Sequence, residues 1–290
     1  MSLLGFPAPA PPPGLVAVSY GGGVNTIALL VALRRMGVVP KSIVMADPGA
    51  ERAGTIRYRD EVLPPWLDAA GFPRVQVVTR AEEGAYRERA WRLETLRQEC
   101  MRIGALPSVA YGWKKCSAKY KGEAQRWHMA RQPWALAEWG AGRRIVKAIG
   151  YDVGEGKRVR RAFGTPWEDA RFFPWYPLHA AGMEREDCAD LILSEGLPLP
   201  PKSACKWCPN NTLQEWEELR DDDPEGFAEA LAMSRNAVAG ITTPDVVGLM
   251  RCNDHGRRQL HVWAEGGYAG ASGRTDDEDS REAQPCECAL

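Results

Sequence analysis

A pair of cysteines separated by two residues is the first feature of the sequence that could do chemistry. Cys205 and Cys208 lie shortly before Thr212 and Glu215, whose spacing predicts a capping box at the start of a helix. The positive end of a helix lowers the pKa of a nearby thiol, and the thiolate is the form that binds metals or attacks electrophiles. Two thiolates fill only half of a four-coordinate metal site, so further ligands must come from elsewhere in the chain.

A run of three glycines follows the first apolar segment and precedes an amphipathic one. Residues 15–18 are typical of a buried strand, and the apolar period over residues 27–36 predicts a helix that ends at Gly37. Glycines let the backbone approach a bulky anion, and the N–H groups at a helix start attract it. The candidate phosphate-binding residues are Ser19, Tyr20, Gly21, Gly22, Gly23, Asn25 and Thr26. The alternative is a plain tight turn, because the spacing matches neither Gly-x-Gly-x-x-Gly nor the lysine-containing P-loop.

Short apolar runs alternate with longer amphipathic segments along the chain, which is typical of parallel βαβ units. The predicted strands are residues 15–18, 42–46, 75–79 and 145–149. The predicted helices are residues 27–36, 55–70 with a break at Pro64-Pro65, 83–103, 184–194 and 212–219. We therefore expect an α/β fold with a doubly wound parallel sheet and a helical, cysteine-bearing C-terminal part. The expected division is a disordered Pro-rich leader (1–14), a nucleotide-binding α/β domain (15–181), a helical part with the Cys-x-x-Cys pair (182–265) and a flexible tail (266–290).

Length and charge limit what the whole chain can be. It has 290 residues, 37 Lys plus Arg against 38 Asp plus Glu, and 44% hydrophobic residues. This composition suits a sizeable core and argues against a chain that coats nucleic acid or membrane throughout. Without an apolar run long enough for a membrane span or a secretion signal, we expect a cytoplasmic protein with no membrane partner. In that reducing compartment the eight cysteines are expected to serve metal or redox chemistry rather than a disulfide framework.

Two further loops follow predicted strands. Asp47, after the second strand, could accept hydrogen bonds from a ribose or an adenine, and the alternative is an Asp-Pro-Gly turn without a ligand. The loop Gly150 to Glu155 follows the fourth strand. Open parallel sheets bind ligands beyond the carboxyl ends of their strands, where both loops and the glycine run are expected to lie.

Two basic clusters accompany these loops. Their members are Lys114, Lys115, Lys119 and Lys121 in the first, and Lys157, Arg158, Arg160 and Arg161 in the second. Such side chains could bind substrate phosphates or a nucleic-acid backbone, and the alternative is a solvated charged face.

The three loops together resemble the nucleotide site of the adenine nucleotide α-hydrolase-like superfamily, which includes phosphoadenylylsulfate (PAPS) reductases and ATP pyrophosphatases. The family's Ser-Gly-Gly-Lys-Asp-Ser loop is matched by Gly21 to Thr26, with valine and asparagine in place of the lysine and aspartate. Ala46 to Glu51 resembles the family's Asp-Thr-Gly segment, which implies that Asp47 holds the nucleoside. Gly150 to Glu155 resembles the Gly-x-x-x-x-Glu loop, whose later arginine corresponds to Arg158 or Arg160.

The resemblance also implies cofactors. Family members with a cluster draw ligands from a segment before the fourth strand and from a later Cys-x-x-Cys, which implies a [4Fe-4S] cluster on Cys100, Cys116, Cys205 and Cys208. Tetrahedral Zn²⁺ on the same four thiols is one alternative, and metal-free thiols are another. The implied nucleotide is ATP or PAPS, with Mg²⁺ beside the ATP. The ending Glu287-Cys288-Ala289-Leu290 is similar to the Glu-Cys-Gly ending of sulfonucleotide reductases, which implies Cys288 as a catalytic nucleophile.

Three functions follow from these features. The leading one is an ATP pyrophosphatase-type enzyme that activates an acceptor by adenylation for sulfur transfer, with an adenine nucleotide, a nucleic-acid acceptor and a sulfur donor as partners. The second is a PAPS or adenylylsulfate reductase that uses Cys288 and a thioredoxin-like reductant. The third is a metal-stabilised nucleotide- or nucleic-acid-binding module without turnover.

Overall fold

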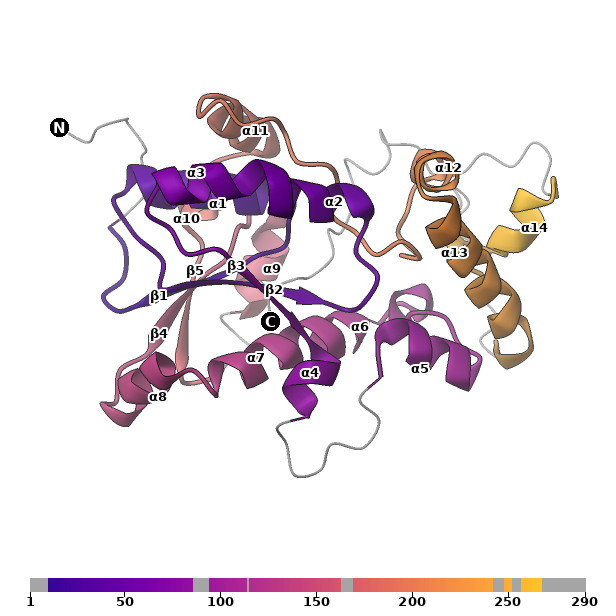
Figure 1. The fold of residues 1–290 in the computed structure, drawn as a ribbon, viewed down its shortest axis with the longest axis horizontal. Coiled ribbons are helices and arrows are strands. Elements are labelled where there is room, and N and C mark those ends of the chain that lie inside the picture. Colours follow the sequence, from indigo (N-terminus) through magenta and orange to yellow (C-terminus); the bar gives the residue numbers. More distant parts are fainter. Residues whose placement is uncertain are drawn as a thin grey trace.

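A five-stranded parallel sheet forms the centre of the protein. The computed structural model describes residues 10–85, 94–113, 115–162, 169–241, 248–251 and 257–267. The strands are β1 (Val16–Ser19), β2 (Ser42–Asp47), β3 (Val75–Thr79), β4 (Ile145–Ala148) and β5 (Phe172–Trp175), in the order β3-β2-β1-β4-β5. Every neighbouring pair in this sheet is parallel, as Figure 1 shows. The predicted α/β fold class is confirmed.

Helices cover both faces of the sheet (Figure 1). On one face lie α1 (Val24–Arg35), α2 (Ala53–Arg57), the π-helical turn η1 (Tyr58–Val62), α3 (Leu63–Ala69), α10 (Pro177–Ala180) and α11 (Arg185–Leu193). On the other lie α4 (Arg80–Gly84), α7 (Glu123–Met129) and α8 (Pro133–Gly140), while α9 (Gly156–Ala162) follows β4. Residues 27–33 of α1 are completely buried, because this helix is enclosed between the sheet and α11. The sheet and α1 therefore fix the position of everything that follows the strands.

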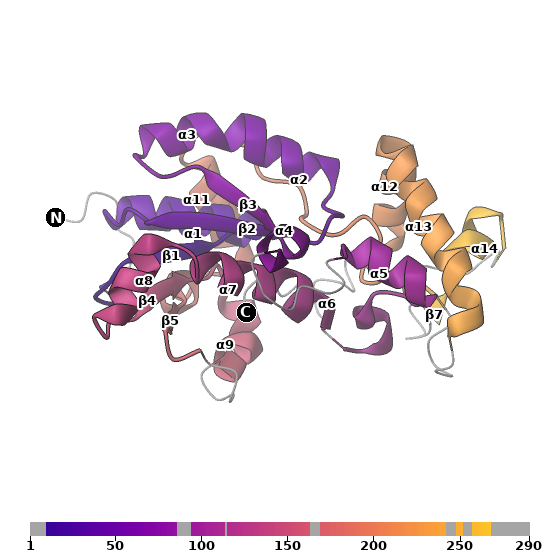
Figure 2. The ribbon, with the colours of Figure 1, turned by 60° about the horizontal axis from the view of Figure 1, so that its bottom comes forward.

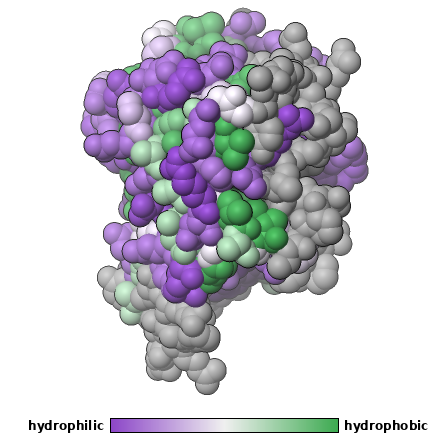
Figure 3. All heavy atoms as spheres, turned by 90° about the vertical axis from the view of Figure 1, so that its right-hand side faces the viewer, coloured by the Kyte–Doolittle hydropathy of each residue, from purple (hydrophilic) through white to green (hydrophobic). Residues whose placement is uncertain are grey.

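A smaller helical part lies beside the sheet (Figure 2). It comprises α5 (Leu96–Ile103), η2 (Ser108–Tyr111), α6 (Lys115–Ser117), η3 (Ala118–Gly122), α12 (Leu213–Asp222), α13 (Pro224–Ala237), η5 (Val238–Gly240), α14 (Leu260–Ala264) and the antiparallel pair β6 (Met250–Arg251) and β7 (Arg257–Arg258). Its apolar core is separate from those of the sheet and contains the fully buried Trp207 and Trp216. Figure 3 views the molecule from the right-hand side of Figure 1, where the described residues present a mainly hydrophilic surface interrupted by small apolar patches. In the described ranges no helix is long and apolar enough to cross a membrane.

The predicted strand positions agree with the structure within one residue at each end, but β5 is missing from the prediction. Pro174 lies inside this strand, and proline is tolerated there because β5 is at the edge of the sheet. The predicted helix over residues 83–103 is wrong as one element. Thr95 begins a new helix, since its side chain accepts from the Gln98 N–H and the Gln98 side chain accepts from the Thr95 N–H.

Two other helix predictions are confirmed. The segment predicted over 55–70 runs from Ala53 to Ala69, which confirms its position. It is continuous through Pro64-Pro65 instead of broken there: the π-helical turn η1 precedes the prolines, which lie in the first turn of α3. At α12 the Thr212 side chain accepts from the Glu215 N–H at 3.1 Å, while the Glu215 carboxylate accepts from the Thr212 N–H at 2.8 Å. The predicted capping box is therefore present.

We expect Thr212→Ala to lower the free energy of unfolding by about 1 kcal/mol, because the buried Thr212 hydroxyl satisfies an N–H at the start of α12. Urea unfolding followed by circular dichroism measures the change. The matched control is Thr212→Ser, which retains the hydroxyl. Equal losses in the two variants would contradict the role of the cap.

Candidate functional site

The candidate site lies at the carboxyl ends of β1, β2 and β4. From β1 the chain enters α1 on one face, whereas from β4 it enters α9, so the strand order reverses between β1 and β4. Ligands in open parallel sheets bind at such switch points. The loops after β1 and β4 touch here, because a Cβ on Gly150 would lie 2.4 Å from the carbonyl oxygen of Asn25.

The glycine loop joins β1 to α1 in a tight bend. Gly22 has φ +79°, and a Cβ on it would lie 2.6 Å from Cγ2 of Thr55, so only glycine fits. Gly23 precedes α1 in extended backbone, and no side chain caps the helix. The Gly21 N–H donates to Oγ1 of Thr26 at 3.2 Å, which closes the loop on itself. The first turn of α1 contains no acidic residue, and this leaves the positive helix end to attract an anion.

Ser19 and Tyr20 precede this loop, and both side chains are buried. The Ser19 hydroxyl donates to Oε1 of Gln125 at 2.7 Å, which turns it toward α7 and away from α1. Tyr20 is 1% exposed, and burial raises the pKa of its hydroxyl above the usual value. The structure therefore brings Gly21, Gly22, Gly23 and Thr26 together and directs the side chains of Ser19 and Tyr20 elsewhere.

Asn25 connects the glycine loop to the loop after β4. Its Nδ2 donates to a carboxylate oxygen of Asp152 at 2.9 Å and to one of Glu155 at 2.8 Å. Arg158 Nη1 lies 2.6 Å from the other Glu155 oxygen, and both side chains of this pair are less than a tenth exposed. Arg160, by contrast, is exposed. Of the two arginines left open by the sequence, Arg158 is therefore the one that belongs to this buried network.

The surroundings of Glu155 shift the pKa of its carboxyl. Burial raises the pKa of its carboxyl, with Asp152 adding to the effect, while Arg158 and the Asn25 amide oppose it. An amide can donate to two carboxylates at once, whereas an aspartate at position 25 would be a third carboxylate.

Asp47 closes a turn at the end of β2. Its Oδ1 accepts the N–H of Gly49 at 2.7 Å and that of Ala50 at 3.2 Å, the Asp-Pro-Gly turn foreseen as the alternative to ligand binding. Gly49 has φ +84°, and a Cβ on it would lie 3.0 Å from the Thr95 side chain. The Leu96 N–H donates to the Pro48 carbonyl at 3.2 Å. This turn therefore holds the start of α5, which carries Cys100, against the sheet.

The Cys-x-x-Cys segment is bound to the stretch that follows the same turn. Glu51 and Cys205 form an antiparallel bridge, in which the Lys206 N–H donates to the Ala50 carbonyl at 2.8 Å and the Arg52 N–H to the Ala204 carbonyl at 3.3 Å. We call residues 50–52 with residues 204–206 the backbone bridge. Ser203, just before it, donates to the Glu51 carboxylate at 3.1 Å, and its side chain also borders Gly22. The thiol segment therefore lies against the glycine loop.

The four candidate metal ligands share one apolar cluster. Cys100 and Cys205 are buried members of the core of the helical part, and Cys116 and Cys208 pack against it. Burial raises the pKa of the Cys100 thiol to about 12, with Glu99 and Cys116 adding to the effect. No disulfide joins the cysteines at described positions. In the part of the chain that the structure describes, no group of three or more His, Cys, Asp or Glu side chains is placed to hold a metal ion. The donor type thus suits a cluster or zinc, whereas the spacing in this structure does not yet form a ligand set.

The remaining cysteines differ in position. Cys188 is fully buried in the core between α11 and α1, where it fills space as a small apolar residue. Cys252, Cys286 and Cys288 lie outside the described residues. The proposed nucleophile Cys288 therefore has no described position relative to the loop.

The two predicted basic clusters have different surroundings. In the first, Lys119 pairs with Glu99 and Lys121 is buried, while Lys114 lies outside the described part of the chain. In the second, Lys157 and Arg160 are exposed on α9, next to the loop after β4. The surface beside the candidate site therefore carries positive charge at α9.

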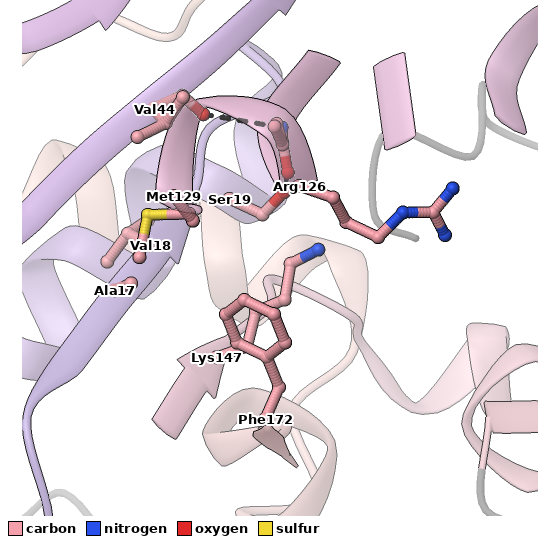
Figure 4. A pocket seen from close by; sticks show the side chains of 9 residues that line it. Ala17, Val18, Ser19, Val44, Arg126, Met129, Lys147 and Phe172 are labelled. Carbon is pink, nitrogen blue, oxygen red and sulfur yellow. Dashed lines mark hydrogen bonds between the residues drawn. The ribbon is translucent and has the colours of Figure 1, made fainter. Parts of the chain in front are cut away.

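A small cavity on the α7 face contains polar residues that the sequence analysis did not select. Its lining, shown in Figure 4, is Ala17, Val18, Ser19, Val44, Gln125, Arg126, Met129, Lys147 and Phe172. The volume is about 20 Å³, roughly enough for one water molecule. Lys147 was detectable as a lone charge inside the apolar strand Ile145–Ala148. Gln125 and Arg126 gave no comparable signal, because they lie on an ordinary amphipathic helix.

The sequence matches no protein-family model and no curated protein. A solved structure similar to this chain is the U34-tRNA thiolase NcsA from Methanococcus maripaludis with its [4Fe-4S] cluster. It is 12% identical, with 92% of this chain and 85% of that chain covered, at a TM-score of 0.37. A similarity of this size does not transfer a function, so the functional proposal must stand on the geometry of the site itself.

Asn25→Asp should destabilise the protein near neutral pH, because three carboxylates would then face one another in a buried site. The pKa of Glu155 is already raised by burial, and a further carboxylate beside it would raise this pKa more, so the folded variant would bind more protons than the unfolded one, and the loss of stability should grow as the pH rises and shrink as it falls. Chemical unfolding at several pH values measures this dependence. Asn25→Ala, which removes the amide without adding charge, is the control, and parallel pH profiles for the two variants would count against the network.

Gly22→Ala is expected to destabilise the loop strongly, because the added methyl group meets Thr55 and requires a positive φ. Gly23→Ala is the neighbouring control, since its φ is −97° and a Cβ there would lie 4.0 Å from Ser203. Melting temperatures of the two variants make the comparison. A Gly22→Ala protein as stable as Gly23→Ala would show that the loop is not constrained in this way.

Proposed function

We propose that this protein is an adenine-nucleotide-dependent enzyme of the ATP pyrophosphatase type. The backbone bridge is the observation that carries the proposal, because it binds the thiol segment to the same edge of the sheet as the glycine loop. Further support comes from the start of α1, which has no side-chain cap, no acidic first turn and a position at the switch point. Together these features suit a nucleotide polyphosphate held near nucleophilic thiols.

The reaction proposed for this site is adenylation followed by sulfur transfer. An acceptor oxygen attacks the α-phosphorus of ATP, the bond to the β-phosphate oxygen breaks, and pyrophosphate leaves. A sulfur donor then attacks the activated carbon, and AMP leaves with the former acceptor oxygen. Amides of the glycine loop would stabilise the polyphosphate, and Arg158 would hold Glu155 and the loop after β4 in position.

A nucleic acid is the acceptor class that we propose. Lys157 and Arg160 are exposed on α9 beside the loop after β4, where they can meet a phosphate backbone. Asp47 retains a second carboxylate oxygen beyond the one that closes its turn, and we propose that this oxygen contacts the nucleoside.

We propose further that Cys100, Cys116, Cys205 and Cys208 ligate a [4Fe-4S] cluster, for which Zn²⁺ is the competing ion. Their shared apolar cluster supplies four thiols from separate segments, and ligation would require these segments to approach one another more closely than they do here. When bound, such a cluster would provide a site for the sulfur atom. The chain's own contribution is to keep this place apolar, with Trp207 and Trp216 excluding water.

ATP binding and pyrophosphate release test the central proposal. We expect the wild-type protein to bind ATP and, anaerobically with a nucleic-acid acceptor and a sulfur donor, to release pyrophosphate. Gly23→Ala should retain binding better than Gly22→Ala, because only the latter distorts the loop. Calorimetry and a pyrophosphate assay provide the readouts. Sulfite release from PAPS without any pyrophosphate from ATP would instead favour a sulfonucleotide reductase.

Metal content tests the thiols separately. Protein purified anaerobically should contain iron and sulfide and absorb visible light, and Cys205→Ser should lose most of this iron. Cys188→Ser is the matched control, because this buried cysteine belongs to the core of the sheet domain. Zinc without iron would identify the competing ion, and equal iron in both variants would refute the ligand assignment.

A further inference from the structure

Lys147 and Arg126 are two cationic residues that line the small cavity on the α7 face of the sheet, opposite the face that α1 covers. Lys147 lies on β4 in register with Ala17 of β1, so its side chain is on the same side of the sheet as Ala17. Ala17 packs in the cluster under α7, whereas Val16 and Val18 pack on the α1 side. Arg126 comes from α7 and completes the same cavity (Figure 4).

Within the described ranges, neither cation has a carboxylate bound to it. Lys147 Nζ lies 6.0 Å from the centre of the Phe172 ring. The Asp169 carboxylate favours the charged form of Lys147, but both Asp169 oxygens accept hydrogen bonds from Arg171. On α7, Glu123 pairs with Arg80. Two cations therefore share a partly buried place with no anion of their own.

The ionisation of Lys147 reflects this arrangement. The pKa of its amine is lowered to about 8, chiefly by burial and also by Arg126, while Asp169 acts in the opposite direction. An anion beside the pair would reverse this shift by favouring the charged amine. The Ser19 hydroxyl in this cavity already donates its proton to Gln125 Oε1, whereas Gln125 Nε2 donates one hydrogen bond to the Val44 carbonyl at 3.4 Å and has a second N–H for such a ligand.

We propose that Lys147 and Arg126 form a subsite for a phosphate-type oxyanion, separate from the glycine loop. The cavity admits about one oxygen-sized group, so one oxygen of the anion would enter beside Lys147 and the others would face the partly buried Arg126. Free inorganic phosphate and the phosphate of a polynucleotide share this chemistry. The subsite lies near the carboxyl ends of β1 and β4, which suits an acceptor phosphate; that assignment rests on the proposed function, whereas anion binding itself does not.

The experiment uses the full chain and three probes: inorganic phosphate, a short 5′-phosphorylated oligoribonucleotide and the same oligonucleotide without the phosphate. The pKa of Lys147 is followed by carbon NMR of labelled lysine, and affinity by calorimetry. We expect phosphate to raise this pKa, and Lys147→Met and Arg126→Gln each to weaken binding about tenfold or more. Lys147→Met should fold, because replacing a partly buried cation by an apolar chain of similar length is well tolerated. Lys41→Met, at the exposed amino end of β2, is the control and should not alter binding.

The probes identify the source of the anion. Tighter binding of the phosphorylated oligonucleotide than of free phosphate, lost in Lys147→Met, supports an acceptor phosphate, and binding of free phosphate alone supports a small-anion subsite. An unchanged Lys147 pKa with both phosphate-containing probes overturns the proposal. An equal loss of ATP affinity in Lys147→Met also overturns it, because the anion would then belong to the nucleotide. Gly22→Ala separates the two proposals, since it should impair ATP binding without abolishing the Lys147 response.

Discussion

The backbone bridge is the interaction on which the arrangement of the candidate site depends. The two main-chain hydrogen bonds of the Glu51–Cys205 bridge connect the stretch after β2 to the thiol segment, although more than 150 residues separate them in sequence. The turn closed by Asp47 holds α5 through the Pro48 carbonyl, so Cys100 is held at the same place. The sheet and the helical part have separate apolar cores, so polar contacts of this kind fix the thiols relative to the glycine loop.

The polar network around Asn25 joins the glycine loop to the loop after β4 without a charged side chain among residues 21–26. Where the resembling family has an aspartate, this chain has an amide that donates to two carboxylates. Among the described residues, Arg158 is the one arginine whose guanidinium contacts this network, and it does so at the Glu155 carboxylate. The positive charge expected of a lysine in the loop is absent at Val24, so the α1 helix end and its amides remain as the attraction for an anion.

The sequence was sufficient for four of the five strands of the sheet and for the bend after β1, because both depend on local patterns. Apolar runs predicted β1 to β4 and the glycines predicted the bend. β5 was not predicted because it contains Pro174, and proline usually interrupts a strand. Thr95 and Gln98 have the spacing of a capping box, a local signal that could have divided the helix predicted over residues 83–103. The backbone bridge and the Lys147 cavity could not be predicted, since both arise from segments that meet only after folding.

The bridge is made almost entirely of main-chain atoms, and this has an evolutionary consequence. Amide and carbonyl groups are common to nearly all amino acids, so the residues of the bridge other than the proposed ligand Cys205 can change identity while the pairing persists. Correlated substitutions between the two segments would then be sparse, and a method that infers proximity from covariation would overlook the contact. Relatives of this chain can diverge at these positions yet keep the thiol segment beside the glycine loop.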